Sequence, residues 1–239
     1  MALFIVAFVA SLIPFTAIYL WLRNAIRKDP GYRKICDRSL IHGVLCTFQI
    51  VLFSLICNIL LGLTGLKNSN PLLYQALYTF IVLALMEETV KFITFRKILK
   101  KTDYRYSLLD VVTIMTIVGI GFGMIESVIY AIGASIPVVL VRGICVPHAG
   151  YGFLVGYFYA KGLKTGNNKH KMTGFILAWL LHGMYDFSLS EEFIAINENL
   201  MYIALLLAVL GIALAIWLIV FTNKARKDEA YMKPLTEMT

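Results

Sequence analysis

The sequence predicts an all-α, polytopic membrane protein. Three observations support this prediction: the composition, the lengths of the apolar segments and the distribution of the basic residues. Of the 239 residues, 59% are hydrophobic and 15% are charged, whereas soluble domains carry about 25% charged residues. The mean hydropathy is +0.78. One soluble core could not bury this much apolar surface, so we expect much of it to face lipid.

Seven segments are long and apolar enough to cross a bilayer as helices, which requires about 20 residues each. They cover residues 2–22, 40–63, 72–95, 108–132, 136–160, 172–190 and 200–222. The first segment has no positive n-region and its charges follow it, so we expect a retained span and not a signal peptide. Short connections predict one helical membrane domain over residues 1–239, with its motif-bearing core in residues 72–190.

The basic residues gather at alternate ends of these segments. Of the 22 Lys and Arg residues, only Lys67 and Arg142 lie elsewhere. Because basic loops stay on the cytoplasmic side, this pattern predicts an external N-terminus, a cytoplasmic C-terminus and an odd number of spans. The net charge of +8 fits this topology and an anionic inner leaflet. No separate basic face exists that would predict nucleic-acid binding.

The four cysteines are Cys36, Cys46, Cys57 and Cys145. They form no CxxC pair, and all lie in or beside the expected spans. We therefore expect free, small core residues and neither a disulfide framework nor a zinc–thiolate site.

Ionisable side chains occur at membrane depth in the expected spans. They are Glu87, Glu88, Asp110, Glu126, Arg142, His148, His182 and Asp186. Asp110 stands near the start of its span, where a structural role is expected, and Arg142 could neutralise a carboxylate. An ionisable group in the apolar interior needs a partner or a water-filled cavity, so we expect the other groups to converge on one hydrated site.

These residue types are suited to several kinds of chemistry. His182 and Asp186 are four residues apart and face the same side of a helix. Glu126 lies deep in its span, and His148 is expected near the middle of the next one. Two imidazoles and a carboxylate are a ligand set of catalytic zinc, with water in the open position. A further carboxylate could then act as general base on that water.

The same residues are compatible with two other interpretations. A buried glutamate beside a histidine can deprotonate water without a metal. Buried carboxylates and histidines can also bind a transported cation or relay protons. Spacing alone does not decide among these three.

Glu87 and Glu88 are adjacent, and consecutive helical residues point about 100° apart. The two glutamates therefore cannot share one role. Lys91 follows them at helix-neighbour spacing, four and three residues later. We expect one glutamate to face the site and the other to pair with Lys91.

Four motifs on successive spans resemble the pattern of a known family. They read EETVK (Glu87, Glu88, Lys91), FGMIE (Phe122, Glu126), HAGYGFLVG (His148, Gly156) and HGMYD (His182, Asp186). In this order they resemble the PrsW family of bacterial intramembrane proteases, which is distantly related to the CAAX-protease and bacteriocin-processing superfamily. The resemblance covers residues 87–186, and no key position departs from the pattern.

The resemblance implies an intramembrane endopeptidase of the bacterial cytoplasmic membrane. It implies a membrane-anchored substrate of the anti-sigma factor type, cut at site 1 in envelope-stress signalling. The catalytic residues it implies are Glu87, Glu88, Glu126, His148 and His182, with Lys91 and Asp186 in support. Arg142, which lies outside the motifs, is expected to support the site by neutralising a carboxylate.

Family members are usually classed as metalloproteases, whereas relatives in the wider superfamily are metal-independent glutamate proteases. With zinc, the ligands would be Glu126, His148 and His182, and Glu87 would be the general base. Without metal, Glu87 and His148 would activate the water, and His182 and Asp186 would stabilise the oxyanion.

Overall fold

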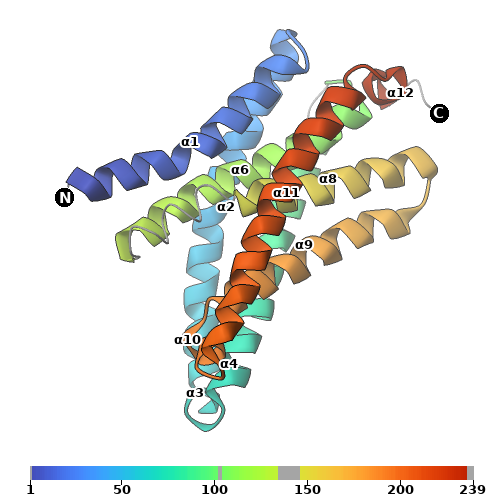
Figure 1. Ribbon diagram of the computed structural model, residues 1–239. Helices are drawn as coiled ribbons and strands as arrows, with labels where there is room; N and C mark the ends of the chain where they lie inside the picture. Colours follow the sequence, from blue (N-terminus) through green and yellow to red (C-terminus); the bar gives the residue numbers. More distant parts are fainter. Residues whose placement is uncertain (1, 102–103, 134–145, 236–239) are drawn as a thin grey trace.

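The computed structural model describes residues 2–101, 104–133 and 146–235. These residues form helices joined by short turns, and no β-strand occurs within these ranges (Figure 1). The all-α prediction is confirmed. Among the described helices, four are long and apolar enough to cross a membrane: Phe8–Ala25, Pro30–Gly62, Leu108–Ile129 and Glu198–Ala225. The three other expected spans carry more polar residues, and their described parts are helical as well.

The first two helices are α1 (Ala2–Ala25) and α2 (Pro30–Gly62). Helix α2 starts where Asp29 accepts a hydrogen bond from the backbone N–H of Tyr32, at 3.0 Å. Pro30 follows at the first helical position, where its missing N–H costs nothing. With 33 residues, α2 is about 50 Å long at 1.5 Å per residue. It therefore extends well beyond the apolar segment that the sequence predicts.

The third expected span is one helical rod made of three parts. It comprises α4 (Pro71–Leu77), the π-helix η1 (Tyr78–Leu85) and α5 (Met86–Lys100), preceded by the short α3 (Leu66–Ser69). Within the π-helical stretch, the carbonyl of Phe80 accepts a hydrogen bond from Nε1 of Trp179 at 2.7 Å. π-helical segments are rare and frequently mark functional sites.

Helix α6 (Leu108–Gly133) is the central element, in contact with α1, α2, α5 and α8. Its start is capped by reciprocal bonds between Ser107 and Asp110, with N···O distances of 2.8 and 3.2 Å. Arg27 adds an ion pair to Asp110 at 3.4 Å. The structural role expected of Asp110 is confirmed.

Glycines allow α6 to approach its neighbours closely. A Cβ on Gly119 would overlap the backbone carbonyl oxygen of His148 on one side. On another side, a Cβ on Gly121 would overlap the carbonyl oxygen of Leu40 in α2. Small residues at such contacts let helix backbones pack against each other. Helix α6 is thereby held tightly between α2 and the site-bearing helix α8.

Helices α8 (Pro147–Thr165) and α9 (Asn168–Ser188) form a hairpin. The expected span 136–160 is only partly described, because residues 134–145 lie outside the described ranges. His148 is the second residue of α8 and not the middle of a helix, as the sequence had led us to expect. Pro147 at the first helical position, after Val146 in a left-handed conformation, sets this start.

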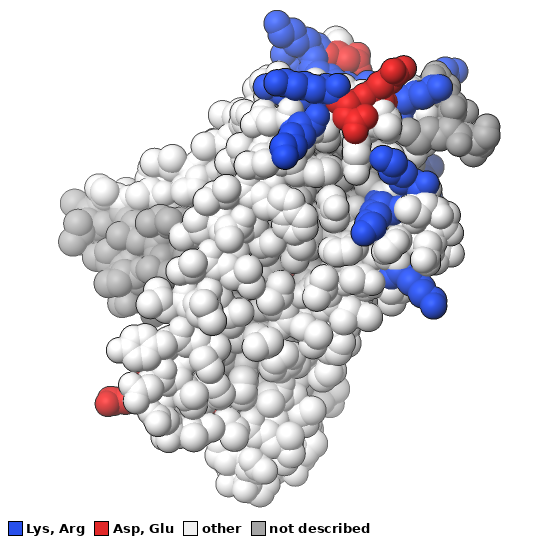
Figure 2. Space-filling view, turned by 45° about the vertical axis from the view of Figure 1, so that its right-hand side comes forward, with Lys and Arg blue, Asp and Glu red and all other residues white. Residues whose placement is uncertain are grey.

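The C-terminal part comprises α10 (Glu191–Ile194), η2 (Glu198–Leu200), α11 (Met201–Ala225) and α12 (Glu229–Met232). Its end returns to the start of α6, because the N–H of Leu235 donates to the carbonyl of Tyr106 at 2.8 Å. Arg27 also donates to the carbonyl of Met232 at 2.8 Å. On the face drawn in Figure 2, the Lys and Arg side chains gather toward one end of the molecule.

The expectation of free cysteines is confirmed for Cys36, Cys46 and Cys57. Cys145 lies outside the described residues. Cys36 and Cys46 are buried, as expected for small core residues.

Candidate active site

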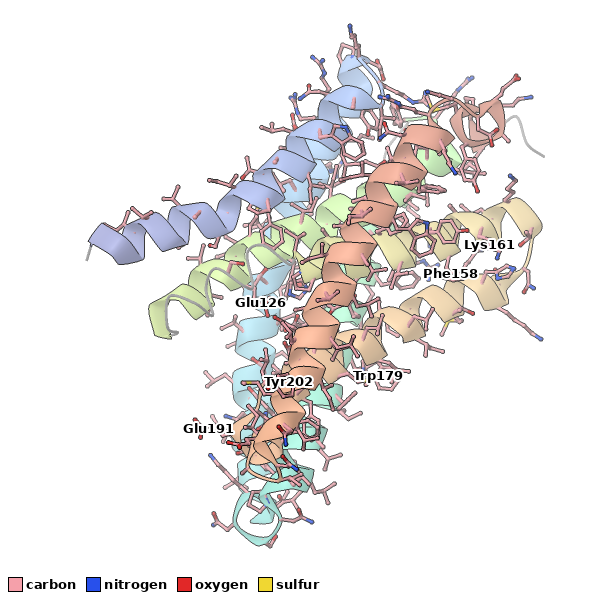
Figure 3. The ribbon with its side chains drawn as sticks, in the orientation of Figure 1. Glu126, Phe158, Lys161, Trp179, Glu191 and Tyr202 are labelled. Atoms are coloured by element: carbon pink, nitrogen blue, oxygen red, sulfur yellow. The ribbon has the colours of Figure 1, made fainter. Side chains whose placement is uncertain are left out.

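Four helices bring the ionisable residues of the four motifs into one cluster. They are Glu87, Glu88 and Lys91 of α5, Glu126 of α6, His148 of α8, and His182 and Asp186 of α9. Figure 3 labels Glu126, which lies on α6 in the interior of the molecule. Six of the seven residues are buried, with exposed fractions between 1% and 8%, and Asp186 is largely covered. Arg142 lies outside the described residues.

Glu88 is the partner of Lys91. The ammonium nitrogen of Lys91 is 2.6 Å from Oε1 of Glu88 and 3.8 Å from Oε2 of Glu87. The same Nζ lies 4.3 Å from the ring centroid of Phe122. Of the two glutamates, Glu88 therefore makes the closer contact with the lysine, and Glu87 lies farther from it.

Glu88 also fixes the orientation of His182. Its Oε1 lies 3.0 Å from Nδ1 of His182. This bond turns Nε2 of His182 toward two other carboxylates, at 3.1 Å from Oδ2 of Asp186 and 3.6 Å from Oε2 of Glu87. A carboxylate behind a histidine fixes the tautomer and ring orientation, as is usual around metal-binding histidines.

His148 connects Glu126 with Lys91. Its Nε2 forms a short contact with Oε2 of Glu126, and its Nδ1 lies 3.2 Å from Nζ of Lys91. An ammonium group can only donate, so Nδ1 is the acceptor in this arrangement. Nε2 then carries the ring proton and donates it to Glu126.

The cluster fits a divalent cation by its donor set and by its charge. Ligand atoms of Glu87, Glu126, His148 and His182 all lie within 4.8 Å of one another. Oε2 of Glu87 is buried and has no hydrogen-bond partner. Imidazole and carboxylate groups are zinc ligands. Among the described residues of the cluster, Lys91 carries the one ammonium beside the buried carboxylates, so an additional positive charge would offset the excess negative charge.

Two features next to this cluster were not predicted from the sequence. The contact between Glu88 and His182 joins residues 94 positions apart, and no short-range spacing predicts it. The π-helix before Glu87 was also not predicted. The sequence offered no local signal for it, because residues four apart also share a face of an ordinary α-helix.

Comparisons with known proteins agree with the motifs. The profile of the PrsW family intramembrane metalloproteases matches residues 35–225. Protease PrsW of Clostridioides difficile is 27% identical over 200 residues, which cover 78% of this chain and 80% of that protein. Protease PrsW of Shouchella clausii is 26% identical over 218 residues, which cover 87% and 93%. No solved structure matches the chain.

Proposed function

The chain belongs to the PrsW family of intramembrane metalloproteases, and we propose that it cleaves a single-span membrane protein at the buried cluster. The observation that supports this most directly is the meeting of all four motifs in one buried site. The transporter alternative has no such support, since the chain's relatives are proteases.

The proposed substrate is a membrane-anchored anti-sigma factor, cut at site 1 in envelope-stress signalling. The resemblance of the motifs to the family pattern supports this choice. The proposed location is the bacterial cytoplasmic membrane, with the bilayer itself as the second partner of the chain.

The proposed topology has seven spans, an external N-terminus and a cytoplasmic C-terminus. The alternation of basic residues along the chain supports it. So does the gathering of Lys and Arg side chains toward one end of the face in Figure 2. The three more polar helical segments would cross the membrane inside the bundle, where their ionisable groups find partners.

We propose that Glu126, His148 and His182 hold a zinc ion. When bound, such an ion would polarise the scissile carbonyl and make its bound water more acidic. Glu87 would take the proton from the attacking water through Oε2, which has no hydrogen-bond partner of its own. Glu88 would orient His182, and Lys91 would keep Glu88 ionised and in place.

The contact of Lys91 with His148 favours a second mechanism. A metal on Nε2 of His148 would require the ring proton to sit on Nδ1, which faces the ammonium of Lys91 at 3.2 Å. In the metal-free mechanism this contact is kept. Glu87 would then take the proton of the attacking water, and His148 would orient Glu126 through its Nε2–H. The imidazole of His182 would donate to the oxyanion, with Asp186, 3.1 Å from its Nε2, keeping that nitrogen protonated.

The test is cleavage of an epitope-tagged, single-span anti-sigma factor, co-expressed with the chain in a host lacking related proteases. Wild type should release a shortened fragment, while Glu87→Gln, His148→Ala and His182→Ala should each release none. Glu191→Gln, an exposed position on α10, is the matched control and should cleave like wild type. Normal cleavage by the three cluster variants, at equal protein levels, would disprove the proposal.

A further inference from the structure

A cavity of about 410 Å³ lies directly beside the cluster. Its walls come from α2, α4, η1, α5, α6 and α9, and its lining includes Glu87, Glu126 and Asp186. We propose that this cavity is the groove that binds the scissile segment of the membrane substrate in an extended conformation. This role of the cavity rests on the proposed protease function. The residues that would hold the substrate backbone are Thr47, Ser54, Gln75 and Thr79.

These four side chains are polar and uncharged. The hydroxyls of Thr47 and Ser54 donate to carbonyls of their own helix, at 3.3 and 3.0 Å, and Nε2 of Gln75 donates to Oγ1 of Thr79 at 3.1 Å. Each hydroxyl keeps an acceptor site, and the Gln75 amide keeps an N–H and its carbonyl oxygen. These four side chains offer donors and acceptors to a neutral peptide backbone, while the charged residues of the lining are Glu87, Glu126 and Asp186, which belong to the cluster.

An extended substrate needs such partners. In a transmembrane helix every backbone N–H and C=O is occupied within the helix, so the scissile carbonyl is not accessible to an attacking water. Unwinding the helix exposes these groups, and lipid cannot satisfy them. A groove with polar side chains at the depth of the catalytic carboxylates removes this penalty at the point of cleavage.

The π-helix aligns the groove with the catalytic residue. Gln75, Thr79, Leu83 and Glu87 all line the cavity, at intervals of four residues. In an α-helix each step of four residues rotates the side chain by about 40°, so Gln75 and Glu87 would point about 120° apart. A π-helix has more residues per turn, because its bonds join residues i and i+5. The η1 stretch therefore reduces this rotation and keeps the four side chains along one wall.

The rim of the groove faces outward between α2 and α6. Val51 of α2 and Ile129 of α6 line the cavity and are 47% and 41% exposed. Exposed apolar side chains at this place suit contact with lipid or with an apolar substrate helix. The substrate would therefore enter sideways from the bilayer, between these two helices.

The first arm of the test blocks the groove. Ser54→Trp places an indole in the cavity, and Leu52→Trp is the matched control on the same helix, because Leu52 is 63% exposed and does not line the cavity. With the tagged single-span anti-sigma factor as probe, Ser54→Trp should cleave at least tenfold more slowly than wild type. Leu52→Trp should stay within twofold. Gln75→Leu should raise KM more than it lowers kcat.

The second arm measures binding without cleavage. A photo-reactive benzoylphenylalanine at position 54 of the Glu87→Gln protein should cross-link the same probe, and one at position 52 should cross-link it at least fivefold less. Equal cross-linking from both positions, or wild-type cleavage by Ser54→Trp, would overturn the groove. Cross-linking from position 54 together with no cleavage by wild type would support the groove and refute the protease function.

Discussion

Replacing Lys91 by methionine removes the ammonium group from the buried cluster while keeping a long apolar side chain. The structure places Nζ 2.6 Å from Glu88 and 3.8 Å from Glu87, and the lysine side chain is 1% exposed. At an effective dielectric constant of about 20, these pairs correspond to gross attractions of roughly 6 and 4 kcal/mol. Desolvation offsets most of this, and loss of one partner of a buried pair costs about 3–5 kcal/mol.

Thermal unfolding of the detergent-purified protein measures this loss. For a chain of this size, 1 kcal/mol shifts the midpoint by about 2–4 °C, so Lys91→Met should lower the midpoint by roughly 6–20 °C. Lys100→Met, at an exposed position in the last turn of α5, should change the free energy of unfolding by less than about 0.5 kcal/mol.

A double variant separates the ion pair from general packing. Adding Glu88→Gln to Lys91→Met removes both charges. The double variant should recover about 2 kcal/mol of the free energy of unfolding that Lys91→Met loses, since contacting residues couple by up to about 3 kcal/mol. Lys91→Arg should keep more proteolytic activity than Lys91→Ala, because the charge is kept. If Lys91→Met unfolds at the same temperature as Lys100→Met, or if the double variant is no more stable than Lys91→Met, the ion pair of Lys91 and Glu88 does not stabilise the fold.

Three further predictions address the metal, the topology and the helix contacts. Protein purified without chelator should contain about one zinc per chain by elemental analysis, as a single catalytic site requires, and His182→Ala should contain none; activity that survives exhaustive chelation would exclude the metal. In a cysteine-free background, a cysteine at Asn68 should react with an impermeant reagent from outside and one at Asn223 should not; the reverse pattern would contradict the topology. Gly119→Ala should lower stability by about 1–3 kcal/mol through overpacking, whereas Gly62→Ala, where no atom lies within 4 Å, should be neutral; equal melting of the two variants would refute the close approach of α6 and α8.

Membrane depth made the cluster predictable. A charged group in an apolar span must find a partner or water. The sequence therefore predicted that four ionisable residues lie next to one another: Glu87, Glu126, His148 and His182. The cluster confirms this convergence. The same logic assigned Asp110 to a helix start, because it stood where a span begins.

Apolar runs did not reveal where α8 begins. Lipid-facing and core-facing residues are both hydrophobic, so composition cannot mark a helix start inside a long apolar stretch. The local signal was Pro147, which favours the first helical position. Placing His148 in the middle of a span overlooked this signal, and the structure puts the residue in the first turn.

Adjacent glutamates of α5 serve one site because consecutive helical residues point in different directions. Glu88 points toward Lys91 and His182 and is held there by both. Glu87, about 100° around the helix, lines the cavity and keeps an oxygen without a hydrogen bond. A buried carboxylate oxygen without a hydrogen bond costs free energy in an apolar interior unless a cation, a water or a substrate binds to it. Glu88, hydrogen-bonded to Lys91 and His182, fixes the geometry, and Glu87 keeps an acceptor oxygen without a hydrogen bond, as a general base requires.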